Sequence, residues 1–195
     1  MSDTLLWYTT RGAGAVSLLL LSAVVVLGIA SFRRFEVPGW PRFLTTGLHR
    51  NLSLTAVAFL AVHIVTALVD PFTHLGWAPA LIPFSSYYRT FWLGLGTIAA
   101  ELMLAVVVTS LARRFIGQTA WRTAHWLAYA CWPIAVVHGL GTGTDSGSAW
   151  LIAIDAVCVM AVGIAVATRL RTPVPDPIGG ARNSFRQRVQ RRASP

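Results

Sequence analysis

Long apolar runs, separated by short polar segments, dominate the chain. Each run approaches or exceeds the ~20 residues that a helix needs to cross ~30 Å of hydrocarbon. The separators are paired arginines, Pro/Gly loops and a turn rich in Gly, Ser and Thr. The pattern predicts an all-α polytopic membrane bundle with five spans, at Gly12–Phe32, Leu48–Val69, Phe91–Ala112, Trp121–Leu140 and Trp150–Thr168.

Two segments outside these runs differ in character. Residues 70–90 combine three prolines with aromatic side chains, which is typical of a connector that lies along a membrane interface. Residues 172–195 begin with prolines and continue with arginines, which predicts a solvated basic tail. The first apolar run lacks a small-x-small cleavage site, so we expect it to remain as a span.

Composition supports the membrane prediction. The chain is 55% hydrophobic and only 12% charged. Its net charge of +9 could indicate a nucleic-acid partner, but every basic residue is an arginine, and the arginines cluster between and after the apolar runs. That placement is typical of topology signals, so no nucleic-acid partner is predicted. Cys131 and Cys158 fall inside apolar runs, where we expect small buried side chains and no disulfide.

The arginines also predict the orientation. Fourteen of the sixteen fall on the side that holds the 33–50 and 113–122 connectors and the tail, whereas only Arg11 and Arg89 fall on the other. By the positive-inside rule the C-terminus is cytoplasmic and the N-terminus lies outside. The predicted location is the cell membrane, which we expect to be the plasma membrane of a bacterium.

Four of the five histidines lie in the second and fourth predicted spans. His49 and His63 are fourteen residues apart, and His125 and His138 are thirteen apart. Because both spans run in the same direction, His49 and His125 form an inner pair near the cytoplasm and His63 and His138 an outer pair, roughly 20 Å away. Neutral imidazoles are good axial ligands of haem iron, and two of them fill both axial positions. The pattern predicts two b-type haems stacked across the membrane.

Each histidine also has a purely structural interpretation, because a single histidine in a membrane helix often serves only as an interhelical hydrogen-bonding residue. Four histidines at two matched depths favour the haem interpretation. One detail does not fit the haem interpretation: thirteen residues of an ideal helix leave His125 and His138 roughly 140° apart around the helix axis. Pro133 lies between them and is expected to bend the helix.

These features resemble the ferric reductase-like transmembrane domain superfamily. The resemblance is carried by the two histidine spacings, by Arg50 after the first histidine, and by Phe91-Trp-Leu-Gly-Leu-Gly96 at the start of the third span. The superfamily includes ferric reductases, NADPH oxidases and the haem-binding membrane subunit of the periplasmic methionine-sulfoxide reductase system. The resemblance covers about residues 10–170 and implies a transmembrane haem domain at residues 1–171, followed by the cytoplasmic tail.

The resemblance implies that His49 with His125, and His63 with His138, bind two haems that pass electrons across the membrane. This sequence departs from it by showing five spans where relatives usually have six, and no flavin- or nicotinamide-binding domain. We therefore expect a separate flavoprotein or a quinol as the electron donor. The expected extracytoplasmic acceptor is Fe(III), oxygen or a partner reductase.

Three arginines stand at depths suited to haem propionates, which favour a nearby guanidinium. Arg11 is the candidate at the outer pair. Arg50 and Arg122 are the candidates at the inner pair, although their positions also suit simple topology signals.

Two carboxylates and one further histidine complete the list of candidates. Glu101 and Asp155 fall inside spans, where a carboxylate is costly and often functional. They are candidates for exchanging protons with a quinone or for tuning a haem potential, or they are protonated residues that bond neighbouring helices. His74 lies in the outer connector, where we expect a solvated side chain more than a metal ligand.

The predicted function is transmembrane electron transfer through two b-type haems, from a cytoplasmic or quinol donor to an acceptor outside. Within the same class, the chain could instead be a haem-binding membrane subunit that feeds a partner reductase. From another class, it could be a haem-free scaffold or transporter whose histidines only pack. Whether the chain is itself an oxidoreductase or an electron-transfer subunit stays open.

Overall fold

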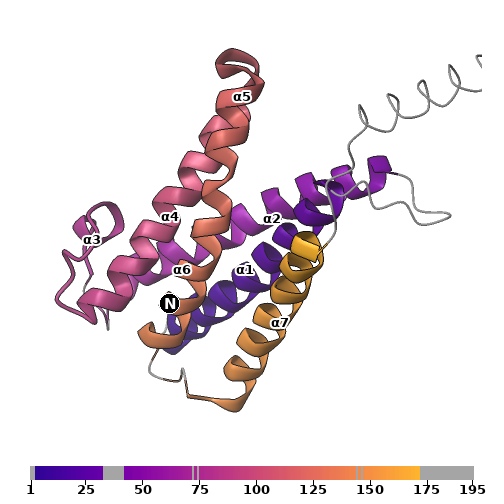
Figure 1. The fold of residues 1–195 in the computed structure, drawn as a ribbon. Helices are drawn as coiled ribbons and strands as arrows, with labels where there is room; N and C mark the ends of the chain where they lie inside the picture. Colours follow the sequence, from indigo (N-terminus) through magenta and orange to yellow (C-terminus); the bar gives the residue numbers. More distant parts are fainter. Residues whose placement is uncertain are drawn as a thin grey trace, which may run out of the picture.

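The computed structural model describes residues 3–32, 42–71, 73, 75–143, 145 and 147–171. Every regular element in these ranges is a helix (Figure 1). The helices are α1 (Asp3–Phe32), α2 (Arg42–Val69), α3 (Ala78–Leu81), α4 (Thr90–Leu111), α5 (Arg113–His125), α6 (Leu127–Thr142) and α7 (Ala149–Arg171). The predicted all-α class is confirmed.

Four of these helices are long and apolar enough to cross a membrane. They contain the segments Thr4–Ser31, Phe43–Val69, Thr90–Leu111 and Ala149–Arg171. Only 6% of the most apolar stretch of α2 is buried inside the protein, so the exposed surface of this helix is compatible with contact to lipid. Their lengths and compositions indicate a multi-pass membrane protein.

The fourth predicted span is where the sequence prediction was wrong. One helix from Trp121 to Leu140 was expected, but α5 ends at His125 and α6 begins at Leu127. The Trp126 N–H donates to the Thr123 carbonyl (3.2 Å) and the Tyr129 N–H donates to the Trp126 carbonyl (3.0 Å). These are i→i−3 bonds, which wind the chain more tightly than an α-helix.

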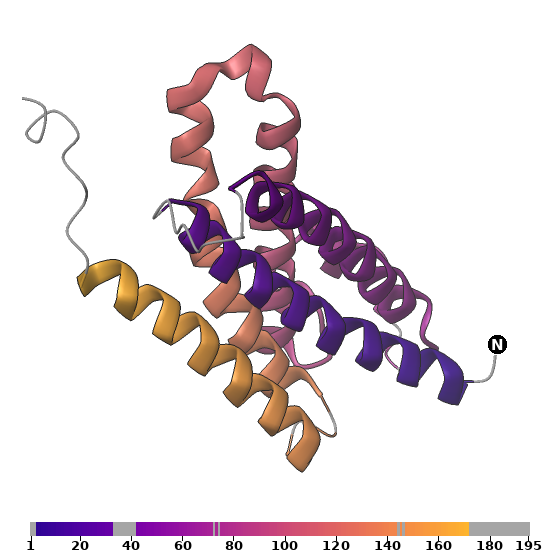
Figure 2. The same cartoon turned by 90° about the vertical axis from the view of Figure 1, so that its right-hand side faces the viewer.

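The interruption does not fall at the proline. Pro133 stays inside α6, and the break lies seven residues earlier, at Trp126. A second irregularity precedes it: Gly117 inside α5 has φ 78° and ψ 167°, which is not helical. A positive φ suits glycine. Helices α4 and α5 run side by side as a hairpin (Figure 2).

Other boundaries also moved. The first helix begins at Asp3 and not at Gly12, and the second begins at Arg42 and not at Leu48. The short helix α3 was not predicted; Pro79 in its first turn suits a helix start because no backbone N–H is lost there. The Thr97 hydroxyl of α4 donates to the Pro79 carbonyl (2.7 Å) and holds α3 in place.

The bundle has two parts. Helix α1 packs against α2 and α7, whereas α4 packs against α6, and α1 makes a smaller contact with α6 (Figures 1 and 2). The two helices that carry most of the paired histidines, α2 and α6, therefore pack mainly on different neighbours. A ligand could therefore lie between α2 and α6 without separating two closely packed helices.

The core contains two clusters of buried side chains that meet at one tryptophan. Two clusters of buried side chains, one around Cys131 and one around Ile29, share Trp132 as a neighbour. The Trp132 indole N–H donates to the Ser22 hydroxyl of α1 (2.9 Å), which satisfies a polar group in an apolar layer. Cys131 and Cys158 are free and buried, as predicted.

Candidate functional site

The structure brings the four histidines together in the expected pairs. The ring centroids of His49 and His125 lie 6.3 Å apart with an interplanar angle of 64°. Those of His63 and His138 also lie 6.3 Å apart, at 78°. A metal–imidazole bond is about 2.0–2.1 Å long, so two rings on opposite sides of one ion have centres about 6 Å apart. Two aromatic rings in edge-to-face contact also have centroids about this far apart. The centroid distance alone therefore does not distinguish a metal-binding pair from a packing pair, and the hydrogen bonds of each ring are needed as well.

In three of the four histidines, Nδ1 donates to a backbone carbonyl of a neighbouring helix. The bonds join His63 to Thr10 (2.8 Å), His49 to Val24 (3.1 Å) and His138 to Trp92 (2.8 Å). A carbonyl can only accept, so Nδ1 carries the hydrogen and Nε2 of the neutral ring keeps its lone pair. Metal-binding histidines show this arrangement, which fixes the tautomer and the ring orientation.

A glycine makes each of these bonds possible. It lies four residues after the accepting carbonyl, and we call each such carbonyl and glycine a glycine cradle. The three cradles are Thr10/Gly14, Val24/Gly28 and Trp92/Gly96. In a helix the carbonyl of residue i points at the N–H of residue i+4, so a ring that reaches it must pass over residue i+4.

The cradles differ in tightness. A Cβ atom would lie 2.6 Å from Nδ1 of His138 if placed on Gly96, 3.0 Å from Nδ1 of His63 if placed on Gly14, and 3.8 Å from Nδ1 of His49 if placed on Gly28. The first distance is a clash, the second is tight, and the third is an ordinary contact. The outer pair therefore depends most on having glycine in these positions.

His125 is the exception. Its Nδ1 is buried and has no hydrogen-bond partner among the described residues. Its ring stacks on Trp121, with centroids 5.1 Å apart and an interplanar angle of 30°. No glycine cradle is described for this ring, so the inner pair is supported from one side only.

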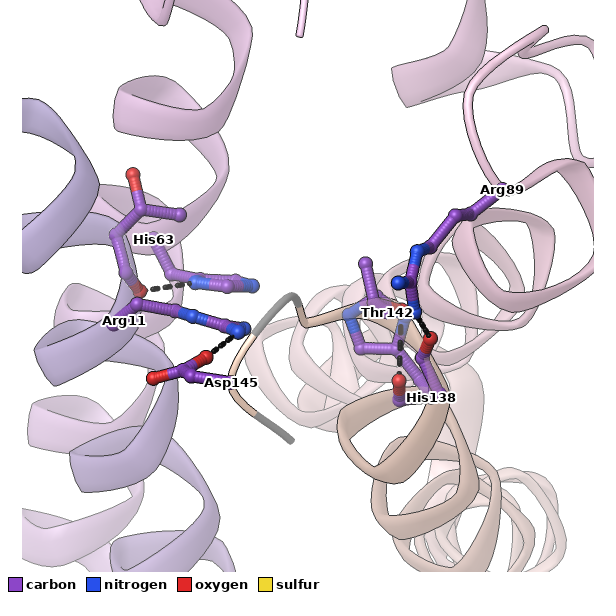
Figure 3. Close-up of polar contacts among 8 residues, drawn as sticks. Arg11, His63, Arg89, His138, Thr142 and Asp145 are labelled. Atoms are coloured by element: carbon purple, nitrogen blue, oxygen red, sulfur yellow. Dashed lines mark hydrogen bonds and ion pairs between the residues drawn. The ribbon is translucent and has the colours of Figure 1, made fainter. Parts of the chain in front are cut away.

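Positive charge flanks the outer pair from two helices (Figure 3). Arg11 of α1 forms an ion pair with Asp145, and Arg89, at the start of α4, donates to the Gly141 carbonyl. The Thr142 hydroxyl lies 3.0 Å from Nδ1 of His138. Sequence reasoning selected Arg11 but missed Arg89, although both were exceptions to the positive-inside count.

A cavity of about 270 Å³ begins at the outer pair. Both outer histidines line it, together with Arg11, Thr142 and Asp155. Its volume is just below the ~300–1,000 Å³ of typical small-molecule pockets. The cavity therefore links the space between the two rings to a carboxylate on α7.

The remaining candidates are less involved. Arg50 and Arg122 are exposed. Glu101 is exposed on α4 and does not line the cavity, so of the two carboxylates predicted inside spans only Asp155 lines it. His74 and the tail at residues 172–195 lie outside the described residues.

Each histidine pair supplies only two ligand groups. Within the described ranges, no three His, Cys, Asp or Glu side chains gather as a metal site would need, but a haem takes only two protein ligands. Comparison with protein families, curated proteins and solved structures finds no match to this chain. The resemblance to the ferric reductase-like superfamily therefore stays a prediction from the histidine pattern.

Proposed function

We propose that this chain carries electrons across a membrane through two b-type haems, one at each histidine pair. The observation that supports this most is the set of glycine cradles at His49, His63 and His138. Each cradle takes the Nδ1 hydrogen and leaves Nε2 as the free ligand atom.

The outer pair fits a haem for an electrostatic reason. Nδ1 of His63 is directed to α1 and Nδ1 of His138 to α4. The Nε2 atoms are thus left for the space between the rings, and neither carries a hydrogen. Two lone pairs directed into one apolar space repel each other unless an acceptor lies between them, and haem iron accepts both. A scaffold whose histidines only pack gains nothing from this arrangement.

The transmembrane arrangement follows from the same residues. We take the second half of α5 together with α6 as the fourth of five crossings, because the sixteen residues of α6 alone rise only ~24 Å against ~30 Å of hydrocarbon. The N-terminus is outside and the C-terminus is cytoplasmic. In support, both arginines that depart from the positive-inside count lie beside the outer pair.

Each residue of the outer site has a role in this proposal. His63 and His138 would hold the haem iron, and Arg11 and Arg89 would be the cations that favour its anionic propionates. Asp145 offsets part of the Arg11 charge. At the inner pair His49 and His125 are the ligands, with Arg50 and Arg122 as the cations at that depth.

A bound haem accepts or releases one electron at a time. The chain holds the two sites at different depths in an apolar bundle, with the buried side chains around Cys131 and Trp132 packed between α1, α4 and α6. The proposed donor is a separate flavoprotein or a quinol. The proposed acceptor outside is Fe(III), oxygen or a partner reductase, and the last of these would make the chain a haem subunit of a larger enzyme.

The visible spectrum of the purified full chain tests the proposal. We expect a sharp reduced α band and about two haems per chain by the pyridine-haemochrome assay. His63→Ala should lower the haem content, whereas His74→Ala, which changes a histidine outside the pairs, should leave it unchanged. A folded, monodisperse chain without haem would support the scaffold and refute electron transfer.

A further inference from the structure

We infer that His125 is the weakly held ligand of the inner pair, so that the inner haem site, unlike the outer one, can admit a small exogenous ligand in place of a histidine. This inference rests on the proposed function, because it concerns the strength of one of the proposed haem ligands. The inference goes beyond the proposed function because it assigns different chemistry to two sites that have similar histidine spacings.

The first step is the asymmetry in hydrogen bonding. His49, His63 and His138 each donate Nδ1–H to a carbonyl of another helix, at 2.8–3.1 Å. Nδ1 of His125 is buried with no partner in the described part of the chain. Loss of such an outer partner typically weakens metal binding 10–100-fold. No hydrogen bond at Nδ1 therefore fixes which nitrogen of His125 carries the hydrogen, and the ring is oriented only by its stacking on Trp121.

The second step is the position of His125 in the backbone. The other three histidines lie within α2 or α6, whereas His125 is the last residue of α5. The segment that carries it lies between two irregular positions, Gly117 and Trp126. A helix end with irregular backbone on both sides resists displacement less than the interior of a long helix does.

The third step concerns what holds each side of the break. Arg169 of α7 lies over the Trp126 ring (5.0 Å) and donates to the Tyr129 hydroxyl (2.5 Å), which fixes the α6 side. On the α5 side, Arg113 lies over Trp121 (4.2 Å), and Trp121 stacks on His125. These contacts lie within the hairpin of α4 and α5. They move with His125 and do not hold it against α2.

Haem retention in single variants tests the inference. His125→Ala leaves the anchored His49 as the remaining inner ligand, whereas His49→Ala leaves the unanchored His125. We expect the inner haem to bind about 10–100-fold more tightly in His125→Ala than in His49→Ala. His63→Ala and His138→Ala each leave an anchored ligand and should resemble one another. Equal haem loss in the two inner variants would overturn the inference.

Carbon monoxide provides a second readout that does not depend on activity. In the dithionite-reduced wild-type chain we expect about one of the two haems to bind it, at a rate that becomes independent of CO concentration because a histidine must leave first. In His125→Ala that rate should instead rise linearly with concentration. Added imidazole should return the oxidised His125→Ala chain to a six-coordinate spectrum.

The assignment to the inner site has its own control. A His63→Ala/His138→Ala chain lacks both outer ligands and should keep the slow CO-binding equivalent. Loss of that equivalent, or two haems that both fail to bind CO in the wild type, would refute the inference and leave two-haem electron transfer intact. A wild-type chain that binds no haem would refute the proposed function itself.

Discussion

The imidazole of His138 lies directly over Gly96, so close that a Cβ atom on Gly96 would stand 2.6 Å from Nδ1. The same ring donates to the carbonyl of Trp92, one helical turn earlier. This relationship explains the sequence Phe91-Trp-Leu-Gly-Leu-Gly96 in structural terms. Trp92 supplies the acceptor, Gly96 supplies the space, and Gly94 leaves room for the Phe84 ring, with which a Cβ would clash.

Replacing Gly96 with alanine should therefore damage the outer site. The new methyl group must displace the His138 ring and break its bond to Trp92, so we expect the outer haem to bind about 10–100-fold more weakly. Overpacking should also cost about 1–3 kcal/mol of stability. The pyridine-haemochrome assay and thermal unfolding of the purified chain measure the two effects.

The matched control is Gly139→Ala, beside His138 on α6. A Cβ there meets nothing within 4 Å, and alanine is a better helix former than glycine by up to ~1 kcal/mol. Gly139→Ala should keep both haems and be neutral or stabilising. The damage should also decrease in the order Gly96, Gly14, Gly28, following the contact distances. Equal effects at all four glycines would show that the cradles do not matter.

Some of this site was present in the sequence but not recognised. Gly14 and Gly28 of α1 are separated by fourteen residues, as are His49 and His63 of the antiparallel α2. Because the two antiparallel helices have the same fourteen-residue spacing, each of these two glycines of α1 lies opposite one histidine of α2. The apolar runs and the histidine pairs were predictable because hydrophobic length and spacing along a helix are local properties. The cradles depend on which helix packs beside which, and no single run encodes that.

The thirteen-residue spacing of His125 and His138 could not be resolved from sequence for a similar reason. The i→i−3 bonds at Trp126 and Tyr129 wind the chain at ~120° per residue where an α-helix turns ~100°, which rotates His125 toward the face of His138. The proline was the visible signal, but the overwound turn lies beside a tryptophan that Arg169 covers. Tertiary contact, and not a helix-breaking residue, marks this position.

The ion pair of Arg11 and Asp145 predicts opposite shifts in the potential of the outer haem. Arg11→Gln removes a positive charge beside the site and should make reduction harder, lowering the midpoint potential. Asp145→Asn removes the partner that offsets Arg11 and should raise it. A change of 1.4 kcal/mol corresponds to about 59 mV for one electron, and we expect shifts on the order of tens of millivolts.

Potentiometric titration followed at the α band measures both shifts. Arg50→Gln serves as the control, because Arg50 is exposed and stands at the depth of the inner pair. It should leave the outer potential within error of the wild type. Shifts of the same sign in Arg11→Gln and Asp145→Asn would contradict an electrostatic role for this pair.

The orientation can be tested with single cysteines at exposed positions of the described chain. Ser85 follows α3 on the side of the outer pair, and Gln118 lies in the hairpin of α4 and α5 on the other side. In right-side-out membrane vesicles, Ser85→Cys should react with a membrane-impermeant thiol reagent and Gln118→Cys should react only after detergent is added. The native cysteines are buried and should give little background. The reverse labelling would exchange the inner and outer sites.

The last prediction concerns the electron donor. A nicotinamide delivers two electrons as a hydride and a haem accepts one, so a flavin must separate the pair. We expect NADH or NADPH alone to leave the haems of the purified 195-residue chain oxidised. Dithionite, a reduced quinone or an added flavoprotein with NADPH should reduce them, as followed by the α band in a stopped-flow spectrometer. Rapid reduction by NADPH without any addition would mean that the chain itself accepts hydride, and the proposal of a separate donor would be wrong.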